Sequence, residues 1–380
     1  MMSDPVALGQ PTVGEAELAA VAEVFASGWL SGAGPTCERF ERRFAGTSGT
    51  AHAVATSSCG SALHLALLVL GAGPGDEVVV ADYTFPATGH AVLWTGATPV
   101  FADVRPDTWG VDPGAVAAAV TPRTVGILAV DPFGQPADYD GLRAVANRHG
   151  LFLVEDAACA AGASYRGRPA GSLADIACFS FHGRKGITAG EGGALTTDDP
   201  GWADAARRLH TYGVAPVPEG GAAPALPVPS FDRAGYNYRM SDVQAGILLA
   251  QLDRLPTLLR RRREVAHAYG ERLAGLEQVL LPHAAPDRSH PWQSYVLTVH
   301  PDLDRDSVAL ALRARGIGCT IGTYASHLQP VYGPQKPLPV SADLFARHLA
   351  IPMHANLTEE EIARVAEAVR EVVALPGVRR

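Results

Sequence analysis

The chain carries Phe179-Ser180-Phe181-His182-Gly183-Arg184-Lys185, which leads into Gly190-Glu191-Gly192-Gly193. Twenty-nine residues before Lys185 stands Asp156, in Glu155-Asp156-Ala157-Ala158, where the apolar run 151–154 ends. The order along the chain is therefore a buried carboxylate at a strand end, a serine, and a lysine in a turn bounded by glycines.

This combination is what pyridoxal phosphate (PLP) chemistry requires. A lysine amine can form a Schiff base with the cofactor aldehyde. A buried carboxylate can keep the pyridine nitrogen protonated, so that the ring accepts electrons. We therefore predict Lys185 and Asp156 as catalytic residues and Ser180 as a phosphate ligand. The structural alternatives are a helix N-cap for Asp156 and an ordinary surface position for Lys185.

Length and composition limit the class of protein. The chain has 380 residues, 47% of them hydrophobic, and a net charge of −8, which argues against general binding to nucleic acid or to an anionic membrane. The five cysteines include no C-x-x-C pair, so we expect neither a disulfide framework nor a metal site. The start lacks the features of a signal peptide, and no uncharged apolar run reaches roughly 18 residues. We expect a cytoplasmic protein.

Helical and strand patterns alternate up to about residue 200, which predicts an α/β fold with a mainly parallel sheet. Ligands bind such sheets beyond the carboxyl ends of the strands, and Asp156 lies at such an end. We predict a large α/β domain over residues 12–249 and a smaller C-terminal α+β domain over 250–380. Helices are expected at 14–27 and 138–149, and strands at 77–80, 99–101, 125–128, 151–154, 176–181 and 193–197.

Three features beyond residue 200 have more than one interpretation. Residues 214–230 contain five prolines, as in a surface loop or a flap near an active-site mouth. Ser241 and Gln244 form a capping pair for a helix that reaches about residue 276 and is bent or broken near Pro256. The arginines at 260–263 are typical of a solvated face, with a phosphate site as the alternative.

Two further segments suit a phosphorylated planar cofactor. Residues 56–63 run from a turn of small residues into a helix, and N–H groups at a helix start favour a phosphate. Any capped helix looks similar, so this signal is weak by itself. Phe85 follows a buried strand, where an aromatic side chain could stack on a planar ring or belong to the core.

Taken together, these segments resemble the nucleotide-sugar aminotransferase family, the DegT/StrS type of fold-type-I PLP enzymes. The resemblance covers nearly the whole chain, with the matching segments in one order. They are Gly28-Trp29-Leu30-Ser31, Phe40-Glu41, Ser61-Ala62-Leu63-His64-Leu65-Ala66-Leu67, Gly75-Asp76-Glu77-Val78, Thr84-Phe85-Pro86-Ala87-Thr88, Glu155-Asp156-Ala157-Ala158, Ser180-Phe181-His182, Gly190-Glu191-Gly192-Gly193, Gly235-Tyr236-Asn237-Tyr238-Arg239-Met240-Ser241 and Leu349-Ala350-Ile351-Pro352-Met353-His354.

The resemblance implies fold type I and a role for each matching residue. Lys185 matches the Schiff-base lysine and Asp156 the partner of the pyridine nitrogen. Asn237 matches the region that reaches the cofactor phosphate of a neighbouring subunit, although Arg239 could serve instead. A homodimer with composite active sites is therefore implied. The remaining cofactor-binding matches are Gly60 and Ser61 in the phosphate loop, Phe85 as the stacking aromatic, and Ser180 as the phosphate ligand.

Two residues depart from the family pattern. Cys159 stands where the family usually has glutamine or histidine, close to the phenolic oxygen of the cofactor, and a thiol is a weaker hydrogen-bond donor. Cys159 is therefore included among the cofactor-binding residues. Asp131 stands where histidine is more frequent. His327 and Arg239 are the candidates for substrate binding, and packing of a loop is the alternative role of His327.

The predicted function is transfer of an amino group from glutamate or glutamine to a keto-sugar, and we expect that sugar to be nucleotide-linked. Lys185 moves the proton, so its pKa must lie below the ordinary value of about 10.4. Both half-reactions share one site, which predicts ping-pong kinetics through pyridoxamine phosphate. A keto-cyclitol aminotransferase uses the same residues, and a PLP-binding regulator without turnover is the alternative outside enzymes.

Overall fold

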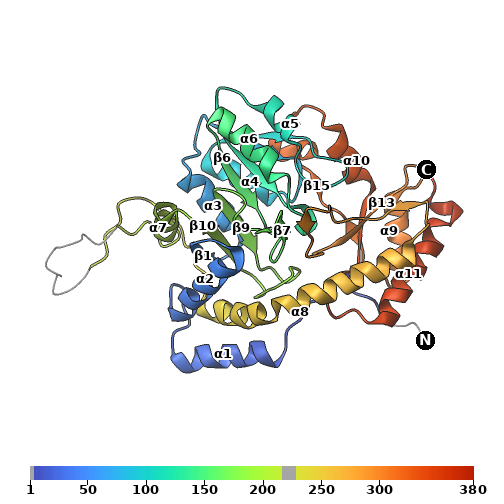
Figure 1. The fold of residues 1–380 in the computed structure, drawn as a ribbon, viewed down its shortest axis with the longest axis horizontal. Coiled ribbons are helices and arrows are strands. Elements are labelled where there is room, and N and C mark those ends of the chain that lie inside the picture. Colours follow the sequence, from blue (N-terminus) through green and yellow to red (C-terminus); the bar gives the residue numbers. More distant parts are fainter. Residues whose placement is uncertain (1–3, 216–227) are drawn as a thin grey trace.

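The structure is a computed structural model that describes residues 4–215 and 228–380 (Figure 1). Most of the proline-rich segment expected as a loop or flap lies outside the described residues. The helices are α1 (Glu15–Ser27), α2 (Pro35–Ser48), α3 (Cys59–Val69), α4 (Ala87–Thr95), α5 (Pro113–Ala119), α6 (Tyr139–His149), α7 (Pro200–Leu209), α8 (Asp242–Leu273), α9 (Arg305–Ala314), α10 (Pro339–Arg347) and α11 (Glu359–Val373).

A seven-stranded sheet forms the larger part of the molecule, in the order β1-β10-β9-β6-β5-β2-β4. The strands from β9 to β4 run parallel, while β10 is antiparallel to both of its neighbours. The bounds are β1 (His52–Thr56), β2 (Glu77–Ala81), β4 (Thr98–Ala102), β5 (Thr124–Val130), β6 (Phe152–Asp156), β9 (Ile176–Ser180) and β10 (Gly193–Thr197). The prediction of a mainly parallel sheet is confirmed.

Helices cover both faces of this sheet, which explains why its strands are apolar throughout rather than alternating with polar residues. In β2, Val78 and Val80 belong to the core under α3 and α4. Val79 and Ala81, which point to the opposite face, belong to the core under α5 and α6. The sheet is thereby buried on both sides.

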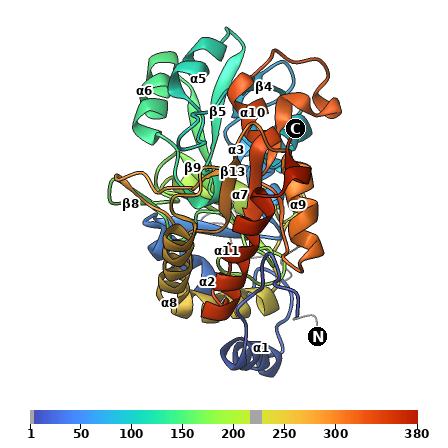
Figure 2. The ribbon, with the colours of Figure 1, turned by 90° about the vertical axis from the view of Figure 1, so that its right-hand side faces the viewer.

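A four-stranded antiparallel sheet, β11-β13-β16-β14, organises the smaller C-terminal part. It shares a core with α9, α11 and the second half of α8, and Figure 2 shows α11 in front of this part. The N-terminal Val6 joins it through a bridge to Ile317. The bounds of its strands are β11 (Val279–Leu280), β13 (Tyr295–Val299), β14 (Thr320–Ile321) and β16 (His348–Ile351).

Helix α8 connects the two parts and continues through Pro256, so of the expected bend or break near this residue, a break does not occur. Pro256 is exposed on this helix. Residues 245–258 contribute to the core beside the large sheet, and residues 265–273 to the C-terminal core. The domain boundary placed at residue 250 stays a prediction. Within the described ranges, no helix is both long and apolar enough to cross a bilayer.

Two small sheets join the C-terminal part to the edge of the large sheet at which the parallel strands end. Strand β15 (Tyr324–Ala325) pairs with β3 (Tyr83–Thr84), which follows β2. A small three-stranded sheet contains β7 (Ser164–Tyr165), β8 (Arg168–Pro169) and β12 (Arg288–Ser289). Residues from both parts of the chain therefore meet beyond the carboxyl ends of β2, β5, β6 and β9.

Candidate active site

A cavity of about 360 Å³ lies at this edge of the large sheet. The carboxyl ends of parallel strands meet at one edge, which brings Asp156 at the end of β6 and Ser180 at the end of β9 to the same cavity. The C-terminal part closes the other side with residues 293–294, 320–323 and 350–353.

Lys185 lies in the turn after β9 and lines the cavity. Its backbone N–H donates to the carbonyl of His182 at 2.8 Å, and its Nζ donates to Sγ of Cys159 at 3.1 Å. Burial lowers the pKa of Lys185, but Cys159, together with Cys59 and Asp156, outweighs burial. The pKa of Lys185 is therefore raised in the protein alone, because two thiols and a carboxylate lie near the amine. The lowered pKa expected from its role in proton transfer is not found there.

Asp156 is 4% exposed and its carboxylate is fixed by hydrogen bonds. Oγ1 of Thr88 donates to Oδ2 at 2.7 Å, and the N–H of Ala158 donates to Oδ1 at 3.2 Å. Thr84 lies 2.8 Å behind Thr88, hydroxyl to hydroxyl. Burial raises the pKa of Asp156, and the bond from Thr88 opposes that rise. A cation against this carboxylate would therefore be strongly held.

Thr88 was not assigned a role from the sequence, although it belongs to the segment 84–88 that carries the family resemblance. Its signal was a hydroxyl at the start of α4, directly after the buried strand β3 that ends at Thr84. The residue orients Asp156 toward the cavity.

The start of α3 forms the predicted phosphate turn. Ser58 is the N-cap and its Oγ accepts from the N–H of Ser61 at 3.1 Å. Ser61 is thus occupied within the turn and does not line the cavity, whereas Ser58, Cys59 and Gly60 do. A Cβ on Gly193 would lie 2.6 Å from the backbone nitrogen of Cys59, so only glycine lets β10 pack against this turn.

Ser180 and Phe85 lie at other points of the cavity wall. Ser180 is 8% exposed and its Oγ accepts from the N–H of His182 at 3.3 Å. Phe85 is 60% exposed, with its ring edge-to-face to that of Tyr324 at 6.2 Å. An aromatic ring so exposed beside a cavity has a free face on which a planar ligand can stack.

These residues fit PLP. A buried amine, a buried carboxylate, the N–H groups of a helix start and an exposed aromatic ring all border one cavity. Each matches one part of the cofactor: the aldehyde, the pyridine nitrogen, the phosphate and the ring. The cavity therefore offers a suitable group for each of these four parts of PLP.

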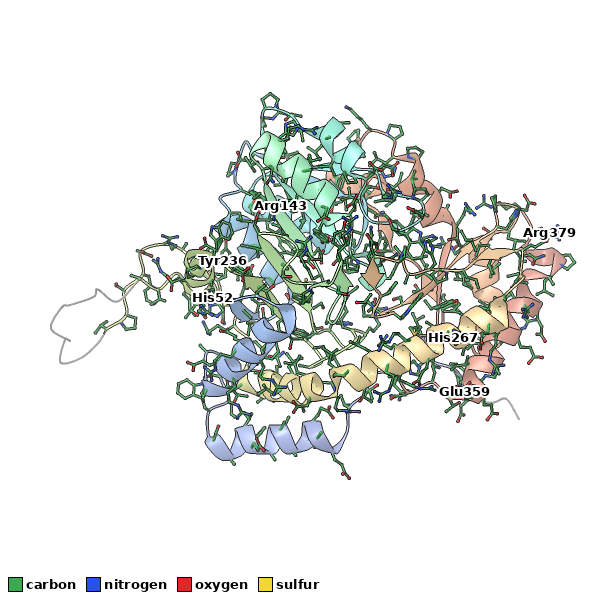
Figure 3. All side chains as sticks on the ribbon, in the orientation of Figure 1. His52, Arg143, Tyr236, His267, Glu359 and Arg379 are labelled. Carbon is green, nitrogen blue, oxygen red and sulfur yellow. The ribbon has the colours of Figure 1, made fainter. Side chains whose placement is uncertain are left out.

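Asn237 and Arg239 do not line this cavity. Asn237 is exposed and its backbone bridges to Thr211. Nη1 of Arg239 is buried without a hydrogen-bond partner, and its guanidinium lies 5.1 Å from the ring of Tyr212. Figure 3 places the neighbouring Tyr236 close to α7, at the opposite end of the molecule from Glu359. The segment is tied to the start of the phosphate turn by the N–H of Ser57, which donates to the carbonyl of Tyr238 at 2.7 Å, while Asn237 itself is exposed.

His327 also lies outside the cavity lining. Its Nδ1 lies 2.7 Å from Oδ2 of Asp82, and its backbone N–H donates to Oδ1 of the same residue at 2.6 Å. The side chain is 5% exposed and that of Asp82 is fully buried. This placement favours the packing alternative: His327 fastens the segment after β15 to the end of β2, and substrate binding by its imidazole stays an untested prediction.

Asp131, the second departure from the family pattern, borders the cavity after β5. Its Oδ1 accepts from the hydroxyl of Tyr139 at 2.8 Å and from the N–H of Ala137 at 3.0 Å. Burial raises its pKa, and Glu155, also fully buried, lies beside it. The contacts give Asp131 a role in holding the turn that follows β5.

Cys159 provides a test of the electronic environment of Lys185. We expect Cys159→Ala to keep catalysis but to shift the pH at which the lysine–cofactor linkage loses its proton, because the thiol lies 3.1 Å from Nζ of Lys185. Spectral titration of both holoproteins from neutral to alkaline pH measures this value. Cys319→Ala, in the C-terminal core, is the matched control. Superimposable titration curves for wild type and Cys159→Ala would show that Cys159 only fills space beside Lys185.

Comparison with known proteins agrees with this geometry. A model of the DegT/DnrJ/EryC1/StrS aminotransferase family matches residues 11–370. The spore coat polysaccharide biosynthesis protein SpsC of Bacillus subtilis (strain 168) is 38% identical over 373 residues, covering 96% of each chain.

Two solved structures are also similar. DesI, in the presence of its TDP-sugar product, superposes with a TM-score of 0.89 at 38% identity, over 98% of this chain and 93% of its own. Spr1654 of Streptococcus pneumoniae in its PLP form gives a TM-score of 0.91 at 28% identity, over 97% and 98%. A PMP form of Spr1654 is similar as well. The predicted fold class, fold type I of PLP-dependent transferases, is confirmed.

Proposed function

Because the chain belongs to the DegT/DnrJ/EryC1/StrS aminotransferase family and is a PLP-dependent sugar aminotransferase, we propose that it transfers the amino group of glutamate or glutamine to a nucleotide-linked keto-sugar. The observation that carries this proposal is the enclosure of Lys185 and Asp156 in one cavity with an exposed stacking aromatic. The TDP-sugar product of DesI, a structural relative, supports the nucleotide-linked substrate class.

The cofactor would be held at four points. Cys59 and Gly60 offer backbone N–H groups to its phosphate, together with the hydroxyl of Ser180. Phe85 would stack on the ring, and Asp156 would hold the protonated pyridine nitrogen. When bound, PLP supplies an electron sink that stabilises negative charge on the carbon losing its proton.

Lys185 then carries out the proton transfers. Its Nζ removes the proton from the α-carbon of the amino donor and delivers a proton at the carbon that receives the amino group. In the protein alone Asp156 contributes to the raised pKa of Lys185. A protonated pyridine ring would neutralise the negative charge of Asp156. Loss of that charge would lower the pKa of Lys185 toward neutral pH. Thr88 maintains the direction of the carboxylate during these steps.

The substrate class can be tested directly. The protein is loaded with pyridoxamine phosphate and mixed in turn with TDP- and UDP-linked keto-sugars, free keto-sugars, keto-cyclitols and simple keto acids. We expect the spectrum of the PLP form to return with a nucleotide-linked keto-sugar. Return only with keto-cyclitols or keto acids would refute the substrate class, and no return with any ketone would refute transamination itself.

We further propose that two chains build each site. Asn237 is exposed and is not among the residues that line the cavity of its own chain. In the proposed two-fold dimer, Asn237 completes the phosphate site of the partner.

Mixing of inactive variants tests this arrangement. Lys185→Ala and Asn237→Ala, each severely impaired alone, should regain activity after unfolding and joint refolding. Half of the dimers are hybrids at equal mixing and each hybrid has one intact site of two, so the recovery should reach about a quarter of wild type. Mass spectrometry confirms the hybrids. Absence of recovery in confirmed hybrids would mean that each site is built from one chain.

A further inference from the structure

Arg184 lines the cavity, and its guanidinium has no partner among the described residues. Arg184 is exposed and lines the cavity next to Lys185 in the chain. Within residues 4–215 and 228–380, its side chain has no carboxylate at ion-pair distance and no hydrogen-bond acceptor, and only its backbone forms hydrogen bonds. The guanidinium of Arg184 is therefore not committed to any described side chain and can bind a ligand.

The backbone of Arg184, by contrast, is firmly held. Its N–H donates to Nδ1 of His182 at 3.3 Å, and its carbonyl accepts from Nε2 of Gln293 at 3.1 Å. The carbonyl of Gln293 in turn accepts from Nη1 of Arg262 at 3.2 Å, and Arg262 is 4% exposed. A fixed backbone lowers the entropy cost of placing the guanidinium on a ligand.

The charges around the cavity make Arg184 the natural site for an anion. Among the described lining residues, the acidic ones are Asp131 and Asp156, and the lysine and arginine side chains are those of Lys185 and Arg184. Lys185 is taken up by the cofactor in the proposed function, and Asp156 holds the pyridine nitrogen. The one arginine at the described wall is then left to meet a negatively charged part of the substrate.

We propose that Arg184 binds the α-carboxylate of the amino-acid donor. This assignment rests on the proposed function. Arg184 precedes Lys185 in the chain and lines the same cavity, so an anion bound by Arg184 would share that cavity with the reacting amine. The α-carboxylate of an amino acid is attached to the reacting carbon itself, whereas the phosphates of a nucleotide-linked sugar lie across the sugar ring. The planar fork of the guanidinium matches a carboxylate in bidentate geometry.

Binding measurements on the PLP-loaded protein test the assignment without turnover. The probe is glutarate, a dicarboxylate that lacks the amine and cannot react, titrated by calorimetry. We expect Arg184→Gln to weaken glutarate binding about tenfold or more, since a hydrogen-bonded charge pair is lost. Arg184→Lys should recover part of the affinity. Arg148→Gln, which removes the same charge from the exposed surface of α6, should bind like wild type.

A second probe, thymidine diphosphate, separates the donor from the sugar nucleotide. We expect its affinity to be unchanged in Arg184→Gln, and the KM for glutamate to rise about tenfold with a smaller change in kcat. Unchanged glutarate binding in Arg184→Gln, or no glutarate binding by wild type, overturns the proposal. Loss of thymidine diphosphate binding in Arg184→Gln, with glutarate binding unchanged, also overturns the proposal, because the guanidinium would then bind the nucleotide. If glutarate behaves as expected but no keto-sugar is aminated, the subsite stands and the proposed function fails.

Discussion

Replacement of Lys185 by alanine should abolish turnover while the cofactor still binds. The phosphate turn at the start of α3, Ser180, Phe85 and Asp156 remain in Lys185→Ala, so the noncovalent contacts are kept. The amine that attaches the cofactor and moves the proton is lost. We expect kcat to fall by about 10³-fold or more, with cofactor retained through gel filtration.

The composition of the chain makes the attachment point easy to verify. It has two lysines, Lys185 and Lys336, and Lys336 is exposed. Borohydride reduction of the wild-type holoprotein followed by peptide mass spectrometry should locate the adduct on Lys185. Lys336→Ala is the matched control and should have wild-type activity. An adduct on Lys336, or substantial turnover by Lys185→Ala, would remove Lys185 from the mechanism.

Asp156→Asn should lower kcat by about 10²-fold or more and leave the fold intact. The amide has the shape of the carboxylate and can still accept from Thr88 and the N–H of Ala158. It lacks the negative charge that keeps the pyridine nitrogen protonated, and a positioned charge of this kind contributes on that scale.

The measurement is kcat at saturating cofactor, with bound PLP determined from absorbance. Asp253→Asn, an exposed carboxylate on α8 paired with Arg43, is the control and should be nearly neutral. Near-normal turnover by Asp156→Asn with full cofactor content would show that the pyridine nitrogen has another partner.

The sequence was sufficient for the parts of the site that strand order determines. Asp156 ends β6 and Ser180 ends β9, and these strands are parallel neighbours, so a buried acid and a serine had to meet at one edge. Lys185 follows in the adjoining turn. The apolar runs at 77–80 and 125–128 predicted β2 and β5 within one or two residues, because a sheet buried on both faces leaves an unmistakable apolar pattern.

Contacts between segments far apart in the chain could not be predicted from the sequence pattern. Nothing in the pattern around His327 indicates that its imidazole pairs with Asp82, 245 residues earlier. Arg262 lies in a run of four arginines that reads as a solvated face, yet it is buried and donates to the carbonyls of Trp292 and Gln293. Burial of a single member of a charged run depends on which element packs there, and local periodicity does not contain that information.

The shared helix α8 ties the two halves of the chain into one cooperative unit. Cutting the chain at residue 250 would split the apolar stripe at 245–258 from the sheet it covers. The C-terminal fragment would then expose Leu252, Leu255 and Leu258, which are nearly inaccessible in the intact protein. Neither fragment could bury its own surface, so exchange of the C-terminal part between relatives requires a junction that preserves this helix from end to end.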